Sequence, residues 1–590
     1  MTAKKMLSQA QYKLDGNGDF VIENYNQSKP FSNFFPGIAG IWGIPMWVFY
    51  VNRGQCIASF GIESKDKAIM EFQPANKSYR SSALQGFRTF IKLRAASKEI
   101  YWEPFQEHLE GTAFKKKQTM SISAHGLVLR EVNQDLGLTV EVNYLTLPEE
   151  PYSALVRDIR IINNTKKNYD IELIDGLPAI MPYGLSDVLN KNMSRTAEAW
   201  VRVRNLKKKA PYYQLNVEVS DTPRVKHIKE GNFFFSFDAQ TAKGQLLNPI
   251  VEAAHVFGES CDFLAPTRFC QKDFRFPKEQ QTSNRTSCAM SYTHFQLKAG
   301  SQKNLVSLFG YAHDEAQLNK ITRQVTKKGF IGKKAKRNEH IIAGVKSFAL
   351  TNSSSSEFDL YSSHTFLDNI LRGGLPVSLK TQDGNVTLNV YSRKHGDLER
   401  DYNYFFIAPT FYSQGNGNYR DVNQNRRNDV WFNEDVGSNH FVSFLNLVQS
   451  DGYNPLVVRG TAFSIKDPKK LAGLLLKAVE QKDAARVKEF LKESFTPGEL
   501  LSFIEKSRIA LSVSPKVFLG GILELCHKEE LADHGEGFWS DHWTYNLDLI
   551  ESYFSLYPEN LSRFLLDEKV FHFYYNTNHV LPRRCRAGRR

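Results

Sequence analysis

The chain of 590 residues is too long for one hydrophobic core, and its 41% hydrophobic and 13% aromatic residues exclude a disordered protein. Its net charge of +13 falls to +8 once the five arginines of residues 583–590 are left out. The other basic runs are short and separated, as in solvated loops. We therefore do not expect a nucleic-acid partner.

Six cysteines are scattered along the chain: Cys56, Cys261, Cys270, Cys288, Cys526 and Cys585. They form neither a CxxC pair nor the spacing of a zinc site, which favours a reducing compartment. The N-terminus lacks the apolar core of a signal peptide. The most apolar segment, residues 37–51, is short and broken by glycines and a proline, so it cannot span a bilayer. We expect a soluble, cytoplasmic protein with no membrane partner.

The first half of the chain has the pattern of strands. Residues 12–24 alternate like an edge strand, and residues 46–51, MWVFYV, read as a fully buried strand. From about 118 to 310, eight runs show period-two alternation or β-branched residues between turn residues. Since no helices intervene, we predict a large antiparallel β-sandwich domain over residues 1–312.

The hydrophobic period changes at about residue 313. Residues 314–325 read as a helix with Asp314 as its N-cap. The following basic, glycine-punctuated stretch, 328–345, is the best candidate for a linker, so we assign residues 313–345 to a helical linker. A further helix over 356–374 ends on two glycines.

The most informative stretch is a polar run between Tyr419 and Trp431. It contains Arg420, Asp421, Asn423, Gln424, Asn425, Arg426, Arg427, Asn428 and Asp429. Forked donors and bidentate acceptors in alternation suit a polyhydroxylated ligand, whose hydroxyls both donate and accept hydrogen bonds. Tyr419, Trp431 and Phe432 add flat faces for sugar rings. The alternative is a helix N-terminus capped by its own polar side chains.

Beyond residue 454 we expect helices. Asp467 and Thr496, each followed by proline, mark two helix starts. A third helix within 535–558 carries Asp541, His542 and Trp543, with Leu547, Ile550 and Tyr553 directed inward. Asp541 and His542 form either an acid/base pair or a capping and core arrangement. Helix pairs joined by polar, aromatic loops predict a toroid of α-hairpins whose loop ends form a sugar cleft.

The C-terminal residues do not complete such a toroid. Residues 571–582 are aromatic enough for a core, but 583–590 are basic, with neither periodicity nor a cap. Six helical hairpins need more helices than residues 345–580 supply. We therefore expect residues 346–582 to be a partial (α/α)6 barrel, ending in a basic tail by frameshift or premature stop.

Three stretches together resemble one enzyme family: FSNFFPGIAGIWGIPMWVFYVNRGQ, NYRDVNQNRRNDVWFN and GFWSDHWTYNLDLIESY. They are similar to the inverting cellobiose and β-oligoglucan phosphorylases of glycoside hydrolase family ninety-four and to the related β-1,3-glucan phosphorylases. The resemblance extends to about residue 582. It implies an N-terminal β-sandwich, a helical linker and an (α/α)6 barrel of the six-hairpin glycosidase type.

The resemblance also implies a reaction. Inorganic phosphate, the co-substrate, attacks the anomeric carbon of a β-linked gluco-oligosaccharide while one carboxylic acid protonates the departing oxygen, giving α-glucose 1-phosphate. Because phosphate replaces the water of an inverting hydrolase, no enzymic base is needed. The resemblance implies no metal or organic cofactor, and a homodimer for the full-length protein.

Site residues follow from the matched motifs. Arg420 and Asp421 match the family's Tyr-Arg-Asp element, which grips hydroxyls of the transferred glucosyl unit, and Gln424 matches its glutamine. The third stretch adds Asp541 and Trp543 as substrate-binding residues. The general acid of the family sits in a Trp-Asn-Asp element that this sequence lacks. We expect that acid to lie beyond Arg590, with Asp421 as the runner-up, and the chain alone to be inactive.

Two other functions stay open. The chain fits an inverting glycoside hydrolase of the six-hairpin class if Asp421 and Asp541 serve as its acid and base. It also fits a non-catalytic carbohydrate-binding protein that uses the sandwich. Asn425 stands where cellobiose phosphorylases commonly have Asp, which weakens the assignment to cellobiose. The linkage of the glucan, β-1,2, β-1,3 or that of cellobiose, is not determined by these residues.

Overall fold

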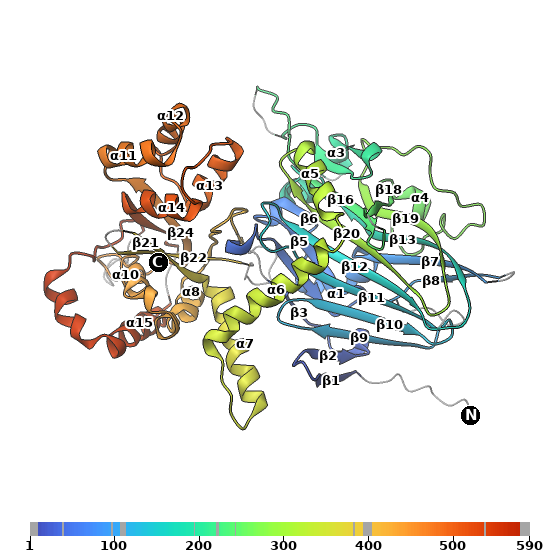
Figure 1. The fold of residues 1–590 in the computed structure, drawn as a ribbon, viewed down its shortest axis with the longest axis horizontal. Helices are drawn as coiled ribbons and strands as arrows, with labels where there is room; N and C mark the ends of the chain where they lie inside the picture. The colour runs from blue at the N-terminus through green and yellow to red at the C-terminus, as the bar shows by residue number, and fades with distance from the viewer. Residues whose placement is uncertain are drawn as a thin grey trace, which may run out of the picture. The chain divides into compact units, whose positions relative to one another are not determined.

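The computed structural model describes residues 10–37, 40–95, 98–106, 114–193, 195–219, 223–241, 243–381, 384–392, 404–535 and 539–578 (Figure 1). The basic tail, residues 583–590, lies outside this set. The chain forms two compact units. The first comprises residues 1–39, 46–342 and 397–404, and the second comprises residues 40–45, 343–396 and 405–590.

The first unit is built on one large antiparallel sheet. Its strands follow in the order β1 (Gln11–Leu14), β2 (Phe20–Glu23), β9 (Lys116–Ile122), β10 (Leu127–Asn133), β11 (Leu138–Thr146), β12 (Ala154–Asn163), β20 (Gln302–Ala312), β16 (Gly231–Asp238), β15 (Tyr212–Leu215) and β14 (Val201–Arg204), with β17 (Gln245–Leu246) beside β16. The register is regular along β11 and β12, from Leu138 opposite Asn163 to Thr146 opposite Leu155. The predicted strand-rich first half is confirmed, but the expectation that no helices intervene between residues 118 and 310 is wrong, because three short helices lie at Asp187–Met193, Arg195–Glu198 and Ala254–Phe257.

Two smaller sheets complete the β structure of this unit. One has the order β18 (Asn248–Ile250), β19 (Ser287–Leu297), β13 (Tyr169–Ile180), β7 (Arg88–Ala95) and β8 (Lys98–Trp102). The other has the order β3 (Ser32–Phe34), β4 (Trp47–Val51), β5 (Ile57–Gly61) and β6 (Ala68–Met70). Strand β4 is buried at every position, as the run MWVFYV predicts. One apolar cluster takes side chains from all three sheets, so they share a core.

A buried ion pair joins the two larger sheets of this unit. Arg157 on β12 donates from Nε and Nη2 to the carboxylate of Asp175 on β13, over 3.0 and 2.7 Å. The same guanidinium donates to Gln55 and Thr89, and both charged side chains are at most 2% exposed. Because each donor has an acceptor, the charges are tolerated in the core. Gln55, which follows the buried strand β4, thus has a packing role.

The helices of the first unit are short except at its end. They are α1 (Ala75–Gln85), α2 (Asp187–Met193), α3 (Arg195–Glu198), α4 (Ala254–Phe257), α5 (Glu315–Val325) and α6 (Phe330–Lys346). Asp314 accepts a hydrogen bond from the Gln317 amide and caps α5 as predicted. Leu318, Ile321 and Val325 of α5 pack with the phenylalanines of β16. The basic stretch that we expected to be a linker forms α6, and the boundary between the units falls inside that helix.

The second unit combines helices with two small sheets. Its helices are α7 (Ser356–Gly373), α8 (Tyr419–Arg426), α9 (Asp429–Phe432), α10 (Asn439–Leu445), α11 (Pro468–Ala478), α12 (Gln481–Phe490), α13 (Pro497–Lys506), α14 (Pro515–Glu524) and α15 (His542–Leu556). Its sheets are the hairpin β21–β22 (Leu375–Lys380 and Asn385–Val390) and the three strands β23 (Gly417–Asn418), β24 (Val457–Ile465) and β25 (Cys526–Asp533).

Two expectations for this unit are wrong. The chain beyond residue 454 is not all helical, because β24 and β25 pair there as antiparallel strands. Of the three residues of α15 expected to point inward, Leu547 is exposed, Ile550 is partly buried against the core and Tyr553 is buried. The fully buried residues of this helix are His542, Asn546, Leu549 and Tyr553. Two of those four residues are polar, so an apolar stripe could not locate the face. The helix starts predicted at Asp467 and Thr496 are confirmed.

No helix among the described residues is long and apolar enough to cross a membrane.

The ion pair of the first unit can be tested by breaking it on either side. We expect Arg157→Met or Asp175→Asn to lower the free energy of unfolding by about 3–5 kcal/mol, because each leaves a buried charge without its partner. Arg160→Met is the matched control. Arg160 lies on the same strand, is 39% exposed and pairs with Glu141, so its loss should cost less than about 1 kcal/mol. Equal losses in chemical denaturation would contradict this account.

Candidate functional site

The polar run predicted to bind sugar forms helix α8 and the residues that follow it. The two-residue strand β23 pairs with β24, Gly417 opposite Val458 and Asn418 opposite Val457, and so fixes the point at which α8 begins. Tyr419, Val422, Asn423 and Arg426 are buried along one face of the helix, whereas Arg420 and Gln424 are exposed. The run is therefore divided into an inner and an outer set by the helix itself.

The inner set forms a buried hydrogen-bond network with α15. The Asn546 side-chain oxygen accepts from the Tyr419 hydroxyl over 2.8 Å and from the Asn423 amide over 2.7 Å. All three side chains are at most 2% exposed. Asn546 in turn donates to Asn454 over 3.5 Å. Since buried polar groups need partners, this network favours one placement of α8 against α15.

On the exposed side of α8, the guanidinium of Arg420 lies between two carboxylates, those of Asp421 and Asp541. Arg420 contacts its neighbour Asp421, with Nε 3.4 Å from Oδ1, and Asp541 at the start of α15, with Nη1 3.7 Å from Oδ2. The side chains of Arg420, Asp421 and Asp541 are 46%, 33% and 43% exposed, so all three can be reached by a ligand. Two segments more than a hundred residues apart thus meet at one cationic and two anionic groups. This cluster is the candidate site.

The aromatic side chains of the predicted sugar site differ in their accessibility. Trp543 on the first turn of α15 and Trp431 on α9 are 44% and 51% exposed, and Phe432 is 40% exposed. Tyr419, in contrast, is completely buried, so its ring cannot carry a sugar as we expected. Its hydroxyl is bound within the core, and burial raises its pKa well above the usual range. Gln424 is exposed on α8 and has no role in the network.

His542 belongs to the core rather than to the outer cluster. It is 1% exposed, and its ring lies against Tyr419 with 4.8 Å between centroids. In the described part of the chain its Nδ1 has no hydrogen-bond partner. Burial lowers the pKa of this imidazole, so the neutral form is favoured. Of the two readings of the Asp541–His542 pair, the structure supports a core histidine.

Two further charged pairs that were not predicted from the sequence stabilise this region. Arg427, the residue after α8, pairs with Asp548 of α15 over 2.6 Å. The Asp429 carboxylate lies 3.0 Å from His440 Nε2, and both side chains are buried. Burial raises the pKa of Asp429 and lowers that of His440. Each pair joins residues that only the packing of helices brings together, which no spacing along the chain can predict.

Comparisons with known proteins return distant structural likenesses. No family model and no curated protein matches the chain. A bacterial glucoamylase in complex with acarbose is 11% identical, with a TM-score of 0.35, over 81% of this chain and 62% of its own. A human-microbiome protein described as a kojibiose phosphorylase is 10% identical, with a TM-score of 0.33, over 75% of this chain and 50% of its own.

A family GH92 α-mannosidase from Bacteroides thetaiotaomicron is 9% identical, with a TM-score of 0.26, over 72% of this chain and 49% of its own. The chain spans less than two thirds of the length of each of these three proteins. TM-scores this low identify neither a fold nor an activity.

The buried network is tested by Asn546→Ala. Alanine has a higher helix propensity than asparagine, so a loss of stability would come from the residues that lose their hydrogen bonds to Asn546 and not from the helix itself. We expect a loss of about 1–3 kcal/mol, because the Asn423 amide is left without its acceptor, whereas the Tyr419 hydroxyl keeps the Phe444 carbonyl at 3.2 Å. We also expect faster amide hydrogen exchange in α8 and α15. Asn428→Ala, at an exposed position after α8, is the control. Unchanged exchange in Asn546→Ala would show that the network does not hold the helices.

The buried histidine predicts a pH dependence with a definite sign. A lowered folded pKa means that the unfolded chain binds more protons below about pH 6.5, so stability falls as the pH drops toward the folded pKa. We expect the melting temperature of the His542→Phe variant to fall less between pH 7 and pH 5 than that of the parent protein. His527→Phe, at an exposed position on β25, should keep the parental slope. Identical slopes in all three proteins would contradict the prediction.

Proposed function

We propose that the protein is a carbohydrate-active enzyme of the glycoside phosphorylase type, which transfers a glucosyl unit from a β-linked gluco-oligosaccharide to inorganic phosphate. In this reaction a phosphate oxygen attacks the anomeric carbon, the glycosidic bond breaks, and the departing oxygen takes a proton. The product is α-glucose 1-phosphate. A six-hairpin, (α/α)6-type architecture for residues 346–582 and a homodimer are part of the same proposal, as is the absence of a metal or organic cofactor.

One observation carries this proposal: Arg420 lies between Asp421 and Asp541 on the exposed side of a buried network. Carboxylates accept hydrogen bonds from sugar hydroxyls, and a guanidinium donates to sugar oxygens in a fixed fork. The network below holds these groups in place before a ligand arrives, which lowers the entropy cost of binding. Trp543, two residues after Asp541 on the first turn of α15, adds an exposed aromatic face.

The proposal assigns binding roles more firmly than catalytic ones. Arg420, Asp421 and Asp541 would hold hydroxyls of the transferred glucosyl unit, with Trp543 beside them and Gln424 further along α8. Asp421 is the first carboxyl group to test as the proton donor. The second candidate function is an inverting hydrolase with Asp421 and Asp541 as acid and base. It is favoured by the presence of two carboxylates around one exposed site.

Product analysis separates these functions. The full chain is incubated with β-1,2-, β-1,3- and β-1,4-linked gluco-oligosaccharides, with and without inorganic phosphate. A phosphorylase forms α-glucose 1-phosphate only when phosphate is present, and a hydrolase releases reducing sugar in both cases. Binding without turnover is the result expected of a chain that lacks the Trp-Asn-Asp general acid, and it fits a carbohydrate-binding protein equally well. If no substrate binds or reacts, the proposed function is wrong.

Substitutions at the cluster test the assigned roles. We expect Arg420→Ala and Asp541→Asn to lower kcat/KM by about tenfold to a hundredfold, because a charge-assisted hydrogen bond contributes roughly 1.5–3 kcal/mol. Part of the loss should fall on kcat if the contacts strengthen in the transition state. If the chain binds a substrate without turning it over, these substitutions should raise the dissociation constant by the same factor.

The control for these variants is a second exposed Arg–Asp pair of the same unit. Arg459 on β24 pairs with Asp533 on β25, and both side chains are exposed. Arg459→Ala and Asp533→Asn should leave kcat/KM unchanged. If Arg420→Ala lowers only the melting temperature and keeps normal kinetics, Arg420 braces the loop and does not bind substrate.

A further inference from the structure

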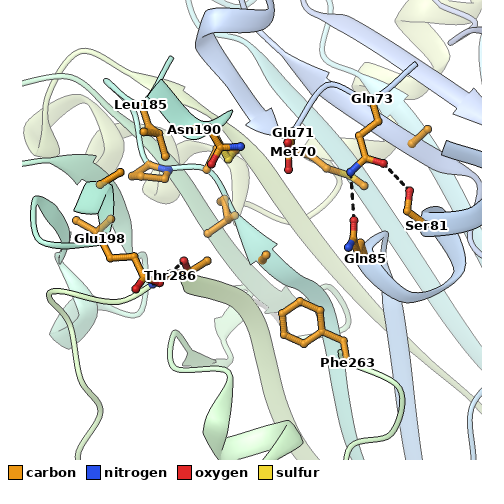
Figure 2. Close-up of a pocket in the computed structure, with 17 residues that line it drawn as sticks. Met70, Glu71, Gln73, Ser81, Gln85, Leu185, Asn190, Glu198, Phe263 and Thr286 are labelled. Carbon is orange, nitrogen blue, oxygen red and sulfur yellow. Dashed lines mark hydrogen bonds between the residues drawn. The ribbon is translucent and has the colours of Figure 1, made fainter. Parts of the chain in front are cut away.

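A cavity in the first unit lies apart from every residue discussed so far. It has a volume of about 180 Å³ and is bounded by α1, α2, α3, the end of β13 and the loop that holds Phe263. Figure 2 shows Gln73, Ser81 and Gln85 on one side of it, Asn190, Glu198 and Thr286 on the other, and the ring of Phe263 below. All of its lining residues belong to one compact unit.

Polar groups on one wall are fixed by one another. The Gln73 amide nitrogen donates to the Gln85 side-chain oxygen over 3.2 Å, and the Gln73 oxygen accepts from the Ser81 hydroxyl over 2.7 Å. Gln73 lies between β6 and α1, whereas Ser81 and Gln85 lie one turn apart on α1. The row Ser81–Gln73–Gln85 therefore presents oriented amides and a hydroxyl to the cavity, with both donors and acceptors.

The cavity also carries two carboxyl groups, Glu198 on the opposite wall and Glu71 two residues before Gln73 (Figure 2). Glu198 Oε1 accepts from the Thr286 backbone amide over 3.0 Å and from its hydroxyl over 2.6 Å. Burial and the nearby Asp187 raise the pKa of Glu71, while the charges of Lys191 and Lys77 and hydrogen bonding to Asn190 oppose that rise. A carboxyl group of this kind donates as well as accepts when it is protonated. Both acids are thus suited to hydroxyl groups.

Phe263 is placed at the cavity in an unusual backbone conformation. Its φ is +56°, in the left-handed region that a bulky side chain rarely adopts. Its carbonyl oxygen accepts from Nη1 of the buried Arg88 over 2.7 Å, which holds the loop in this conformation. Strained backbone is retained where the surrounding structure enforces it, and such positions concentrate at binding sites. The ring gives the cavity one flat apolar face.

Charge and size restrict the ligand. Among the described residues that line the cavity, two are Glu and none is Lys, Arg or His. Lys191 and Lys77 act on Glu71 from outside the lining, so an anionic ligand such as a sugar phosphate would meet carboxyl groups and no lining cation. A single aromatic ring is not the cage that a quaternary ammonium group prefers. The volume lies below the roughly 300–1,000 Å³ of pockets for drug-sized ligands, so it fits one small ring.

We propose that this cavity binds one neutral monosaccharide unit, with Glu198, Asn190 and Gln73 on its hydroxyls and Phe263 against its ring. Amides, hydroxyls and carboxyl groups on two walls match a ligand whose hydroxyls both donate and accept, and the apolar residues between them face its C–H groups. The proposal does not depend on the function of the second unit, because it uses no residue of that unit.

The test is saturation-transfer NMR on the full chain with glucose, galactose, mannose and xylose, alongside glucose 1-phosphate and choline. We expect at least one neutral sugar to bind. We also expect Glu198→Gln and Phe263→Ala each to weaken that binding by about two- to tenfold, as for the loss of one hydrogen bond or one aromatic contact. Glu198→Gln keeps an acceptor for Thr286, so its fold is preserved. Glu259→Gln, at an exposed position, is the matched control.

The outcomes separate this site from the one in the second unit. Binding that survives Arg420→Ala but weakens in both cavity variants supports the proposal. Binding that is lost in Arg420→Ala and kept in both cavity variants overturns it, while supporting the proposed function. The proposal also fails if none of the four sugars binds, or if glucose 1-phosphate or choline binds through the cavity instead. Melting temperatures identify any variant that does not fold, and Asn190→Leu then replaces Phe263→Ala.

Discussion

The side-chain oxygen of Asn546 is the point on which the candidate site depends. It accepts from both Tyr419 and Asn423, and none of the three side chains reaches water. A shift of α8 by one residue along α15 would break both hydrogen bonds to Asn546 and leave the Asn423 amide unpaired in the core, at a cost of about 1–3 kcal/mol. The network therefore fixes the register of the two helices. The positions of Arg420 and Asp541 follow from that register.

In the first unit, a buried ion pair between Arg157 and Asp175 fixes the packing of two sheets. Arg157 and Asp175 lie on strands of different sheets, so their contact fixes how one sheet lies over the other. A charged pair is costly to bury, and it is retained here with Gln55 and Thr89 as further acceptors for the guanidinium. In both units a hydrophobic core supplies the stability, and one buried polar group restricts the packing to a single arrangement.

The sequence predicted the elements whose pattern is local. Alternation located the strands of the first unit, and the N-caps Asp314, Asp467 and Thr496 located three helix starts, because each depends on a few neighbouring residues. Strand β25, CHKEELAD, was missed since it lacks apolar alternation and is held by pairing with β24. The burial of Tyr419 could not be predicted either, because its partners are 25 and 127 residues away.

Arg420 and Asp541 lie close together because the buried residues next to them in the sequence, Tyr419 and His542, are in contact. Successive residues of a helix point about 100° apart, so a buried residue at a helix start has exposed neighbours on both sides. Tyr419 is the anchor of α8 and precedes Arg420, while His542 is the anchor of α15 and follows Asp541. The two anchor rings lie 4.8 Å apart in the core. Their neighbours must then meet above them, which brings Arg420 within 3.7 Å of Asp541. His542 therefore contributes to the site through its packing, and its side chain diverges from that of Asp541.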